Sequence, residues 1–299
     1  MPEIPDLALY VEHLERRIVG ETLERVRVAG WNLLRSTEPP LTAAEGRRVA
    51  GVRRVGKRLV FALEGGPWLA LHLMLSGRLH WRTPGTACPR RTGLAAFDFA
   101  PGTLLLTEAS TKQRAALHVV ADAAALTTLD AGGVEPLAAG AAEFAAALAR
   151  EDHTLKRALT DPRLFAGIGN AYSDEILHRA HLSPFKRTSQ LSGDDTLRLR
   201  AAVVDVLTEW TERLRAEAGD KFPEKVTAFH EGMAVHGRFR KPCPVCGAPV
   251  QRVAYAEHEM NYCAPCQTGG RLLADRALSR LLRDDWPRTL EELEERRRV

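Results

Sequence analysis

The sequence predicts an α+β multidomain protein: an N-terminal β-sandwich with a leading α-helix, then a helical domain, then a C-terminal four-cysteine hairpin. Three observations give this prediction. Short apolar runs broken by Gly and Pro fill residues 24–120, Ala- and Leu-rich stretches follow residue 140, and four of the five cysteines lie within residues 243–266. Short strands at such spacing favour two packed sheets over alternating strand–helix units.

The first twenty residues predict a helix. Pro5 and Asp6 suit a first helical turn, where backbone N–H groups lack partners, and Gly20 suits its end. Between them, apolar side chains recur at helical spacing, at Leu7, Tyr10, Val11, Leu14 and Ile18. That face is expected to pack on the sandwich and so to hold the chain's N-terminal amine in a fixed place.

Six short segments then predict strands, because each is apolar or alternating and is bounded by turn residues. They are Arg25–Ala29, Arg58–Leu63, Trp68–Leu75, Ala95–Phe99, Thr103–Thr107 and Ala115–Val120. Gly132, Gly133 and Pro136 predict a linker near residues 130–140. Helices are expected at Ala141–Arg150, Thr154–Thr160, Ala171–Ala180 and from Asp194 to about Ala216. The predicted domains are residues 1–130, 131–237 and 238–268, with a charged tail at 269–299.

Composition narrows the class of protein. The chain has 299 residues, a net charge of +4 and no apolar run long enough to span a membrane. With no signal-peptide hydrophobic region, we expect a cytosolic protein, which we also expect to be a monomer with no membrane partner. Six basic residues and no acid lie between Gly46 and Leu63. They indicate either a solvated strand face or a surface for a polyanion, and the sequence leaves both open.

The opening Met-Pro-Glu could support covalent catalysis by an N-terminal amine. Removal of Met1 would expose the secondary amine of Pro2. Because the pKa of an α-amino group is about 8, a useful fraction of this amine is unprotonated and nucleophilic at neutral pH. Such an amine attacking a sugar C1′ forms an iminium intermediate, and Glu3 could serve as the acid or base. The same three residues also open many proteins by chance.

A Gly-Ile-Gly-Asn turn precedes the third expected helix. The N–H groups and dipole at the helix start, around Asn170, would favour a phosphate. A plain helix–helix turn with an Asn cap is the alternative, and the turn alone does not decide between them.

The four clustered cysteines predict a metal site. Cys243, Cys246, Cys263 and Cys266 form C-x2-C-x16-C-x2-C, the spacing of a four-cysteine zinc ribbon. Four thiolates leave no open position for water, so we expect one structural Zn²⁺ per chain. Nearby basic residues suggest that the hairpin meets a polyanion, although such ribbons also mediate protein contacts.

Taken together and in this order, these parts resemble the formamidopyrimidine-DNA glycosylase/endonuclease VIII family over roughly residues 1–267. The family's helix–two-turns–helix motif is similar to His153–Ala180, and its zinc hairpin to Pro242–Gln267. The resemblance implies a bifunctional DNA glycosylase/AP lyase of base-excision repair. It would remove a damaged base from DNA and cleave the strand at the abasic site by β or β,δ elimination.

The resemblance also implies roles for particular residues. Pro2 is the expected nucleophile, Glu3 the expected acid/base and Lys57 a phosphate contact beside the damaged site. Met74 would be the apolar wedge that fills the space left by a flipped base. The remaining expected DNA contacts are Arg114, Lys156, Asn170 and His258.

Several positions depart from the family's pattern. Glu108–Ala115 replaces a segment that supplies a void-filling Arg and Phe; Arg114 or Lys112 could serve for the Arg, and the Phe has no equivalent. His258 stands where relatives carry an arginine, and Gly219–Gly232 lacks a Thr-Thr-Leu segment. These differences leave the lesion open, 8-oxoguanine included. Two rivals remain: a non-catalytic damaged-DNA-binding protein on the same scaffold, and a zinc-ribbon transcription factor. The second does not explain the N-terminus or the sandwich.

Overall fold

The computed structural model describes residues 1–224, 226–227, 229–255, 258–274 and 287–298. The chain divides into two compact units. The first comprises Met1–Gly133 together with Thr208–Ala228, and the second comprises Val134–Leu207 together with Phe229–Val299. The predicted fold class is confirmed: the first unit holds two antiparallel sheets behind a leading helix, and the second holds a bundle of helices and a cysteine hairpin.

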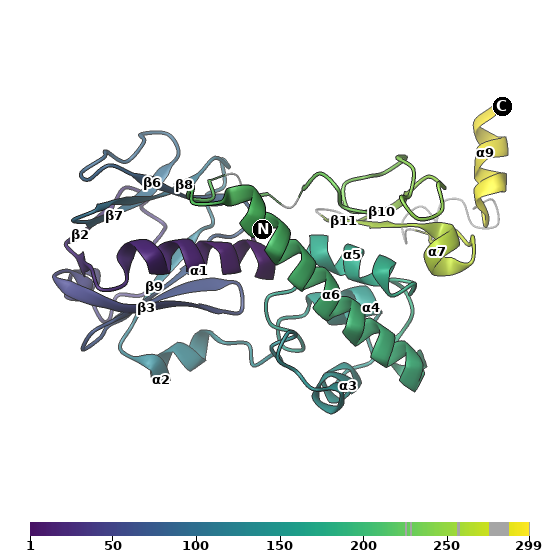
Figure 1. Cartoon of the computed structure of the whole chain (residues 1–299), viewed down its shortest axis with the longest axis horizontal. Helices are drawn as coiled ribbons and strands as arrows, with labels where there is room; N and C mark the ends of the chain where they lie inside the picture. Colours follow the sequence, from purple (N-terminus) through teal and green to yellow (C-terminus); the bar gives the residue numbers. More distant parts are fainter. Residues whose placement is uncertain (225, 228, 256–257, 275–286, 299) are drawn as a thin grey trace. The chain divides into compact units, whose positions relative to one another are not determined.

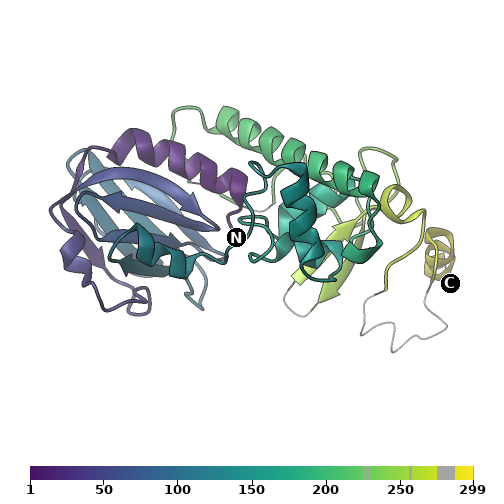
Figure 2. The same cartoon turned by 90° about the horizontal axis from the view of Figure 1, so that it is seen from below.

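Helix α1 (Ile4–Ile18) leads the first unit and packs against the strands of one sheet (Figures 1 and 2). Its apolar face is buried as the periodicity predicts, with Leu7, Tyr10 and Leu14 fully enclosed. At its start, the N–H of Glu3 donates to Asp6 Oδ2 at 2.9 Å. This bond satisfies a backbone group that the helix itself leaves unpaired.

The two sheets form the sandwich. One has the order β1-β3-β4-β5-β9 and the other β2-β7-β8-β6. The strands of the first are β1 (Thr22–Leu23), β3 (Arg47–Val55), β4 (Arg58–Leu63), β5 (Trp68–His72) and β9 (Ala116–Val120). Those of the second are β2 (Arg25–Val28), β7 (Gly93–Phe99), β8 (Gly102–Glu108) and β6 (Gly77–Arg82). Their inner faces share one apolar core.

All six predicted strands are present, and three further strands were missed. Strand β3 carries four arginines, and β6 carries two arginines and a histidine, so their alternation is hidden by polar side chains. The predicted strand Trp68–Leu75 ends early, at His72, because the chain turns there. Met74 in this turn has φ of 52°. Gly77 closes the turn, since a Cβ there would lie 2.2 Å from the carbonyl oxygen of Leu73.

Three short helices and the segment after residue 207 complete the first unit. The short helices are η1 (Leu41–Ala44), α2 (Ala123–Leu126) and η2 (Thr127–Leu129). Arg215 pairs with Glu12 of α1 at 2.6 Å, and Phe222 lies 5.8 Å from the ring of Tyr10. Glu224 accepts hydrogen bonds from Arg82 of β6. These contacts fix residues 208–224 on the sandwich.

The second unit contains the helices that follow the linker. They are α3 (Ala141–Ala149), α4 (Leu155–Thr160), α5 (Asn170–Arg179), η3 (Thr188–Gln190) and α6 (Gly193–Ala218), whose last part belongs to the first unit. All four predicted helices are present. Phe144 and Phe165 pack at 4.8 Å between ring centres, and every residue of α5 from Ala171 to His178 is buried.

The cysteine hairpin follows. Strands β10 (Gln251–Tyr255) and β11 (His258–Tyr262) pair in an antiparallel fashion, and α7 (Ala264–Thr268) and α9 (Leu290–Arg298) come after them. Leu290 and Leu293 of α9 pack on the apolar side of the hairpin. Part of the predicted charged tail, residues 275–286 with Leu278, Leu281 and Leu282, lies outside the described residues. None of the described helices is long and apolar enough to cross a membrane.

Candidate active site and metal centre

The N-terminal turn is buried. Pro2 and Glu3 are both enclosed, and Glu3 is only 2% exposed. The bond from the N–H of Glu3 to Asp6 ties this turn to the rigid start of α1. The predicted nucleophile and acid/base are therefore neighbours in one fixed turn, the arrangement that such chemistry needs.

Two cations lie near the terminal amine. Burial is the main factor that lowers the pKa of the Met1 α-amino group, and the charges of Arg78 and Lys57 lower it further. The carboxylates of Glu3 and Asp6 act in the opposite direction. A lowered pKa leaves more of an amine unprotonated and therefore nucleophilic at neutral pH.

His72, which the sequence reasoning left without a role, belongs to the same cluster. Burial above all, followed by the charges of Arg58 and Lys57, lowers the pKa of His72 to about 4. Its Nδ1 accepts the backbone N–H of Met74 at 3.0 Å. The imidazole thus holds the predicted wedge residue in its left-handed conformation, which costs a non-glycine residue about 1–2 kcal/mol. In the sequence, this role was indicated by the position of His72 two residues before Met74, in His-Leu-Met-Leu.

Met74 and Arg114 are carried by two loops that one buried carboxylate joins. Glu108 Oε2 accepts the N–H groups of Arg114 and Ala115, each at 2.9 Å. Its Oε1 accepts the Ser76 hydroxyl at 3.3 Å. The Arg114 side chain is exposed and Met74 is half-buried. The loop bearing the expected arginine and the loop bearing the expected wedge are therefore fixed with respect to each other.

Lys156 and Asn170 meet at the start of α5. The Lys156 ammonium donates to the Asn170 carbonyl at 2.6 Å, to Ser173 Oγ at 2.8 Å and to Asp174 Oδ1 at 2.5 Å. These bonds occupy all three of its donors. Asn170 donates from Nδ2 to the Glu259 carbonyl of β11 at 2.9 Å. Lys156 adds positive charge at the helix start while its contacts lie within α5.

Two further carboxylates of α5 were missed at the sequence level. Asp174 pairs with His236 Nδ1 at 2.8 Å and accepts the N–H of Asn261 at 3.1 Å. Glu175 accepts the N–H groups of Ala234, Val235 and His236 at 2.7–2.9 Å. Burial raises the pKa of Glu175, against the effect of these bonds. Their signal in the sequence was an adjacent Asp-Glu pair within residues 170–179.

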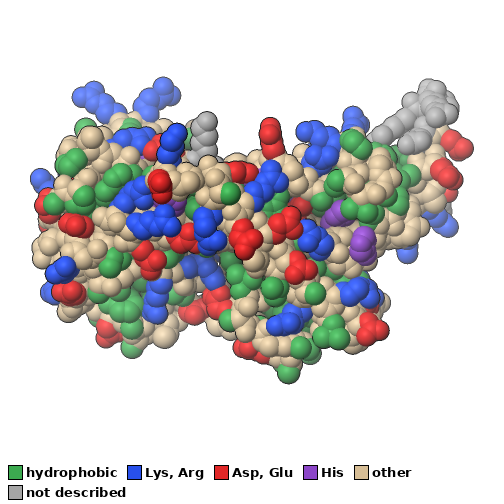
Figure 3. Space-filling view, in the orientation of Figure 1, with side chains coloured by type: hydrophobic (Ala, Val, Ile, Leu, Met, Phe, Trp, Pro, Cys, Tyr) green, Lys and Arg blue, Asp and Glu red, His purple; other side chains and the backbone are tan. Residues whose placement is uncertain are grey.

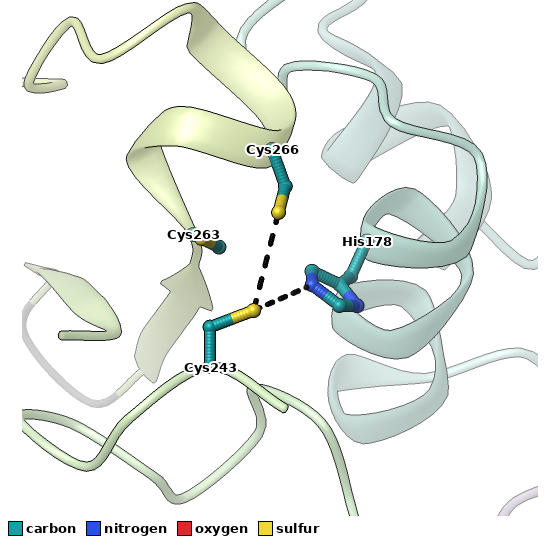
Figure 4. Close-up of side chains that lie close together, drawn as sticks. All are labelled: His178, Cys243, Cys263 and Cys266. Atoms are coloured by element: carbon teal, nitrogen blue, oxygen red, sulfur yellow. Dashed lines mark hydrogen bonds between the residues drawn. The ribbon is translucent and has the colours of Figure 1, made fainter. Parts of the chain in front are cut away.

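The four cysteines gather as the spacing predicts. The sulfur atoms of Cys243 and Cys266 are 4.0 Å apart, and those of Cys246 and Cys263 are 3.3 Å apart. Tetrahedral zinc with Zn–S bonds of about 2.3 Å would place its sulfurs about 3.8 Å apart, so the four thiols fit such an ion. One further side chain points at the cluster, namely His178 of α5 (Figure 4).

Basic side chains extend along the hairpin. The guanidinium groups of Arg240 and Arg252 lie over the ring of Phe239, at 5.1 and 4.5 Å from its centre. The backbone of His258 lies in β11, and its side chain is outside the described part of the chain. Over the face drawn in Figure 3, Lys and Arg side chains are interspersed with acidic ones.

Comparisons with known proteins identify the family that this chain resembles. The model of the formamidopyrimidine-DNA glycosylase N-terminal domain matches residues 1–120, and that of the formamidopyrimidine-DNA glycosylase H2TH domain matches residues 133–218. The formamidopyrimidine-DNA glycosylase of Thermus thermophilus is 34% identical over 277 residues, which covers 90% of this chain and 100% of the relative. A formamidopyrimidine-DNA glycosylase-like protein of Mycobacterium tuberculosis is 41% identical over 151 residues, covering 50% of this chain and 94% of that protein.

Solved structures show the same fold. The crystal structure of the MutM (Fpg) protein from Thermus thermophilus matches with a TM-score of 0.74 and 33% identity, over 89% of this chain and 98% of that one. Lactococcus lactis formamidopyrimidine-DNA glycosylase, crystallised with abasic-site DNA, matches with a TM-score of 0.76 and 23% identity, over 89% and 99% of the two chains.

Proposed function

The chain belongs to the formamidopyrimidine-DNA glycosylase family, and on that premise we propose that the amine of Pro2 carries out its chemistry. The protein is a base-excision-repair DNA glycosylase with AP lyase activity, and its partner is damaged DNA. The observation that carries the assignment of the nucleophile is the buried N-terminal turn, in which Pro2 and Glu3 are enclosed and tied to the start of α1. Burial, and then the charges of Arg78 and Lys57, lower the pKa of the Met1 amine, whose place the Pro2 amine takes once Met1 is removed. We place its activity in the cytoplasm, on nucleoid DNA.

The proposed reaction has three steps. After Met1 is removed, the Pro2 nitrogen forms a bond to C1′ as the glycosidic bond breaks, and the base leaves with the electron pair and takes up the proton that the Pro2 nitrogen loses. Glu3 donates a proton to O4′ as the sugar ring opens, which leaves an iminium between C1′ and the nitrogen. Loss of a C2′ proton then expels the 3′ phosphate by β elimination.

The other predicted residues hold the DNA in this proposal. Lys57 contacts phosphate beside the amine, while Met74 and Arg114 enter the space left by the flipped nucleotide, whose extrusion costs a few kcal/mol. Asn170 binds phosphate at the start of α5, and Lys156 supports it by charge and by fixing that turn. His258 is proposed to contact phosphate from the hairpin. Replacing Asn170 or Lys156 with Ala should weaken binding about equally across DNA sequences.

We propose that the four cysteines hold one structural Zn²⁺. Bound thiolate ligands stabilise so small a hairpin, so loss of the ion should unfold it locally and abolish DNA binding. Metal analysis of the purified protein should give one zinc per chain, and replacing any of the four cysteines with Ser should lower both zinc content and DNA affinity. Cys88→Ser, outside the cluster, is the matched control. Full DNA affinity at clearly substoichiometric zinc would refute the proposal.

Borohydride trapping tests the nucleophile. Reduction of the iminium leaves a permanent protein–DNA crosslink, and peptide mapping identifies the amine that formed it. The processed protein should crosslink to abasic DNA through Pro2, and a form that retains Met1 should neither crosslink nor cleave. Pro2→Gly, which keeps a primary amine but loses the ring, should be impaired.

Two outcomes would overturn the assignment. A crosslink on Lys57 or Lys156 would move the nucleophile to that side chain. If correctly processed protein bound lesion DNA without crosslinking to any lesion in a defined panel, the non-catalytic DNA-binding rival would be favoured. The same panel measures which base is excised and whether cleavage proceeds by β or by β,δ elimination.

A further inference from the structure

Helix α5 contacts the cysteine hairpin along its whole length. Asn170 at its first position bonds to the carbonyl of Glu259, and Asp174, four residues later, accepts the N–H of Asn261. Residues four apart lie above one another on a helix. The next residue in this row is His178, so the row that begins at the proposed phosphate site ends at the cysteines.

His178 is directed at the cluster. Its Nε2 lies 3.3 Å from Cys243 Sγ, and the residue is only 4% exposed. Nε2 and the sulfurs of Cys243, Cys263 and Cys266 all lie within 4.8 Å of one another. Figure 4 shows the ring pointing from α5 toward Cys243.

We propose that His178 donates a hydrogen bond from Nε2–H to the Cys243 thiolate of the metal-bound site, and so makes α5 part of the zinc centre. The inference rests on the zinc site proposed above. One Zn²⁺ with four thiolates carries two negative charges, and Cys243 and Cys263 are buried. An N–H donor delocalises part of this charge, and hydrogen bonds of this kind change metal affinity and hold the ligands in place.

The imidazole could instead be a ligand, with three thiolates completing the tetrahedron. The ligand atoms that all lie within 4.8 Å of one another come from His178, Cys243, Cys263 and Cys266, and the Cys246 sulfur lies 3.3 Å from that of Cys263, close enough for both to reach one ion. Because the C-x2-C-x16-C-x2-C spacing supplies four thiolates for one tetrahedral ion, we assign His178 to the hydrogen bond rather than to the metal. As a positioning residue, it couples the hairpin to the helix that bears Asn170.

Replacement of the metal by Co²⁺ in the full-length protein tests this directly. A hydrogen bond stabilises the thiolate lone pairs, so its loss should move the thiolate-to-cobalt charge-transfer absorption to lower energy. We expect this shift in His178→Phe and His178→Met, which lack the donor, and its partial reversal in His178→Gln, which retains an N–H. Release of zinc to a chromophoric chelator should be about 10–100-fold faster in the first two variants.

His181→Asn is the matched control. His181 Nδ1 lies 3.3 Å from the carbonyl oxygen of Cys266, so it contacts hairpin backbone rather than a thiolate. Its φ is 54°, a conformation that Asn tolerates. The control should leave both the charge-transfer band and the zinc release rate unchanged. Circular dichroism of each variant establishes that it is folded.

Three results would contradict the inference. If the charge-transfer energy and the zinc release rate were unchanged in both variants that lack the donor, His178 would serve only to pack α5 against the hairpin. A ligand field of three sulfurs and one nitrogen in the wild-type protein, lost in His178→Phe, would make His178 a ligand. Zinc content of the wild type is measured first, because its absence would refute the zinc proposal itself, whereas a normal content with unaffected variants refutes only the role of His178.

Discussion

The two units build their proposed sites in opposite ways. In the first, Lys57, His72 and Arg78 come from separate strands and turns and surround one amine, and the charged groups among them alter its pKa. In the second, one helix, α5, carries most of the site, and its carboxylates Asp174 and Glu175 each accept several hydrogen bonds. Substitution of Glu3 in the first site should therefore change chemistry more than stability, and substitution of Lys156 beside α5 should do the reverse.

The strongest test of this contrast is Glu3→Gln. The amide keeps the shape of the side chain and loses its titratable proton, so single-turnover base excision should fall about 10²–10⁴-fold. Borohydride crosslinking to abasic DNA should persist, and thermal stability should change little. Asn170→Ala is the comparison from the second unit: it should weaken DNA binding and leave excision at saturating enzyme intact. An equal loss of base excision in both variants would show that the two units do not differ in this way.

Lys156→Ala tests the second unit's side of the comparison. The ion pair joins Lys156, whose side chain is 14% exposed, to the fully buried Asp174. The substitution takes the ammonium from a buried carboxylate that keeps only His236 and the Asn261 N–H, and should lower the free energy of unfolding by about 3 kcal/mol, measured by denaturant titration. Lys186→Ala removes a cation from a more exposed pair, with Asp195, and should cost about 1 kcal/mol or less. Similar small losses in both would show that Lys156 serves mainly the DNA.

His72 should give the first unit a pH dependence of its own. Its pKa in the folded protein is about 4, below the ordinary 6.5, so the unfolded chain binds the proton more readily. The stability that the neutral ring confers is complete above about pH 6.5 and is lost as pH falls toward 4, by at most about 3 kcal/mol. In urea titrations, the difference between wild type and His72→Gln should shrink over this range. If the free energies of unfolding of the two proteins changed in parallel with pH, this prediction would be contradicted.

Sequence patterns predicted the parts whose signals are local. The cysteine spacing, the helix of residues 4–18 and the Gly-Ile-Gly-Asn turn each depend on residues that are close in sequence. Strands β3 and β6 were missed because Arg and His side chains obscure their alternation. Their positions follow from pairing with β4 and β8, which is a property of the assembled sheets.

The missed site residues share a different cause. His72 and Arg78 approach the terminal amine only when the turn after β5 and strand β6 are folded beside the start of α1. The three bonds of Glu175 and the contact of His178 with Cys243 join residues about 60 apart in sequence. Helical spacing places these side chains on α5, but it cannot indicate what the rest of the chain brings to them.

The smallest expected effect concerns the start of α6, within the second unit. Asp195 receives the Lys186 ammonium at 2.5 Å and Arg198 at 2.5 Å, and its own N–H donates to Ser192 Oγ at 3.1 Å. The Lys186 contact above all lowers the pKa of Asp195 to about 2. Because the folded pKa lies below the ordinary value, the stabilisation is complete above about pH 4 and is lost as pH falls through 2.

Asp195→Asn should therefore lower the free energy of unfolding by about 1–2 kcal/mol at neutral pH, since it weakens a helix cap and removes a partly screened ion pair. Between about pH 4 and pH 2 the wild type should lose this advantage and approach the variant. Asp194→Asn removes the same charge from the neighbouring exposed position and should change stability by less than about 0.5 kcal/mol at any pH. Because neither residue lies in the proposed catalytic turn, crosslinking to abasic DNA should stay at the wild-type rate in both. A fall in that rate for Asp195→Asn would mean that the helical unit also sets the chemistry, and the separation of roles between the two units would fail.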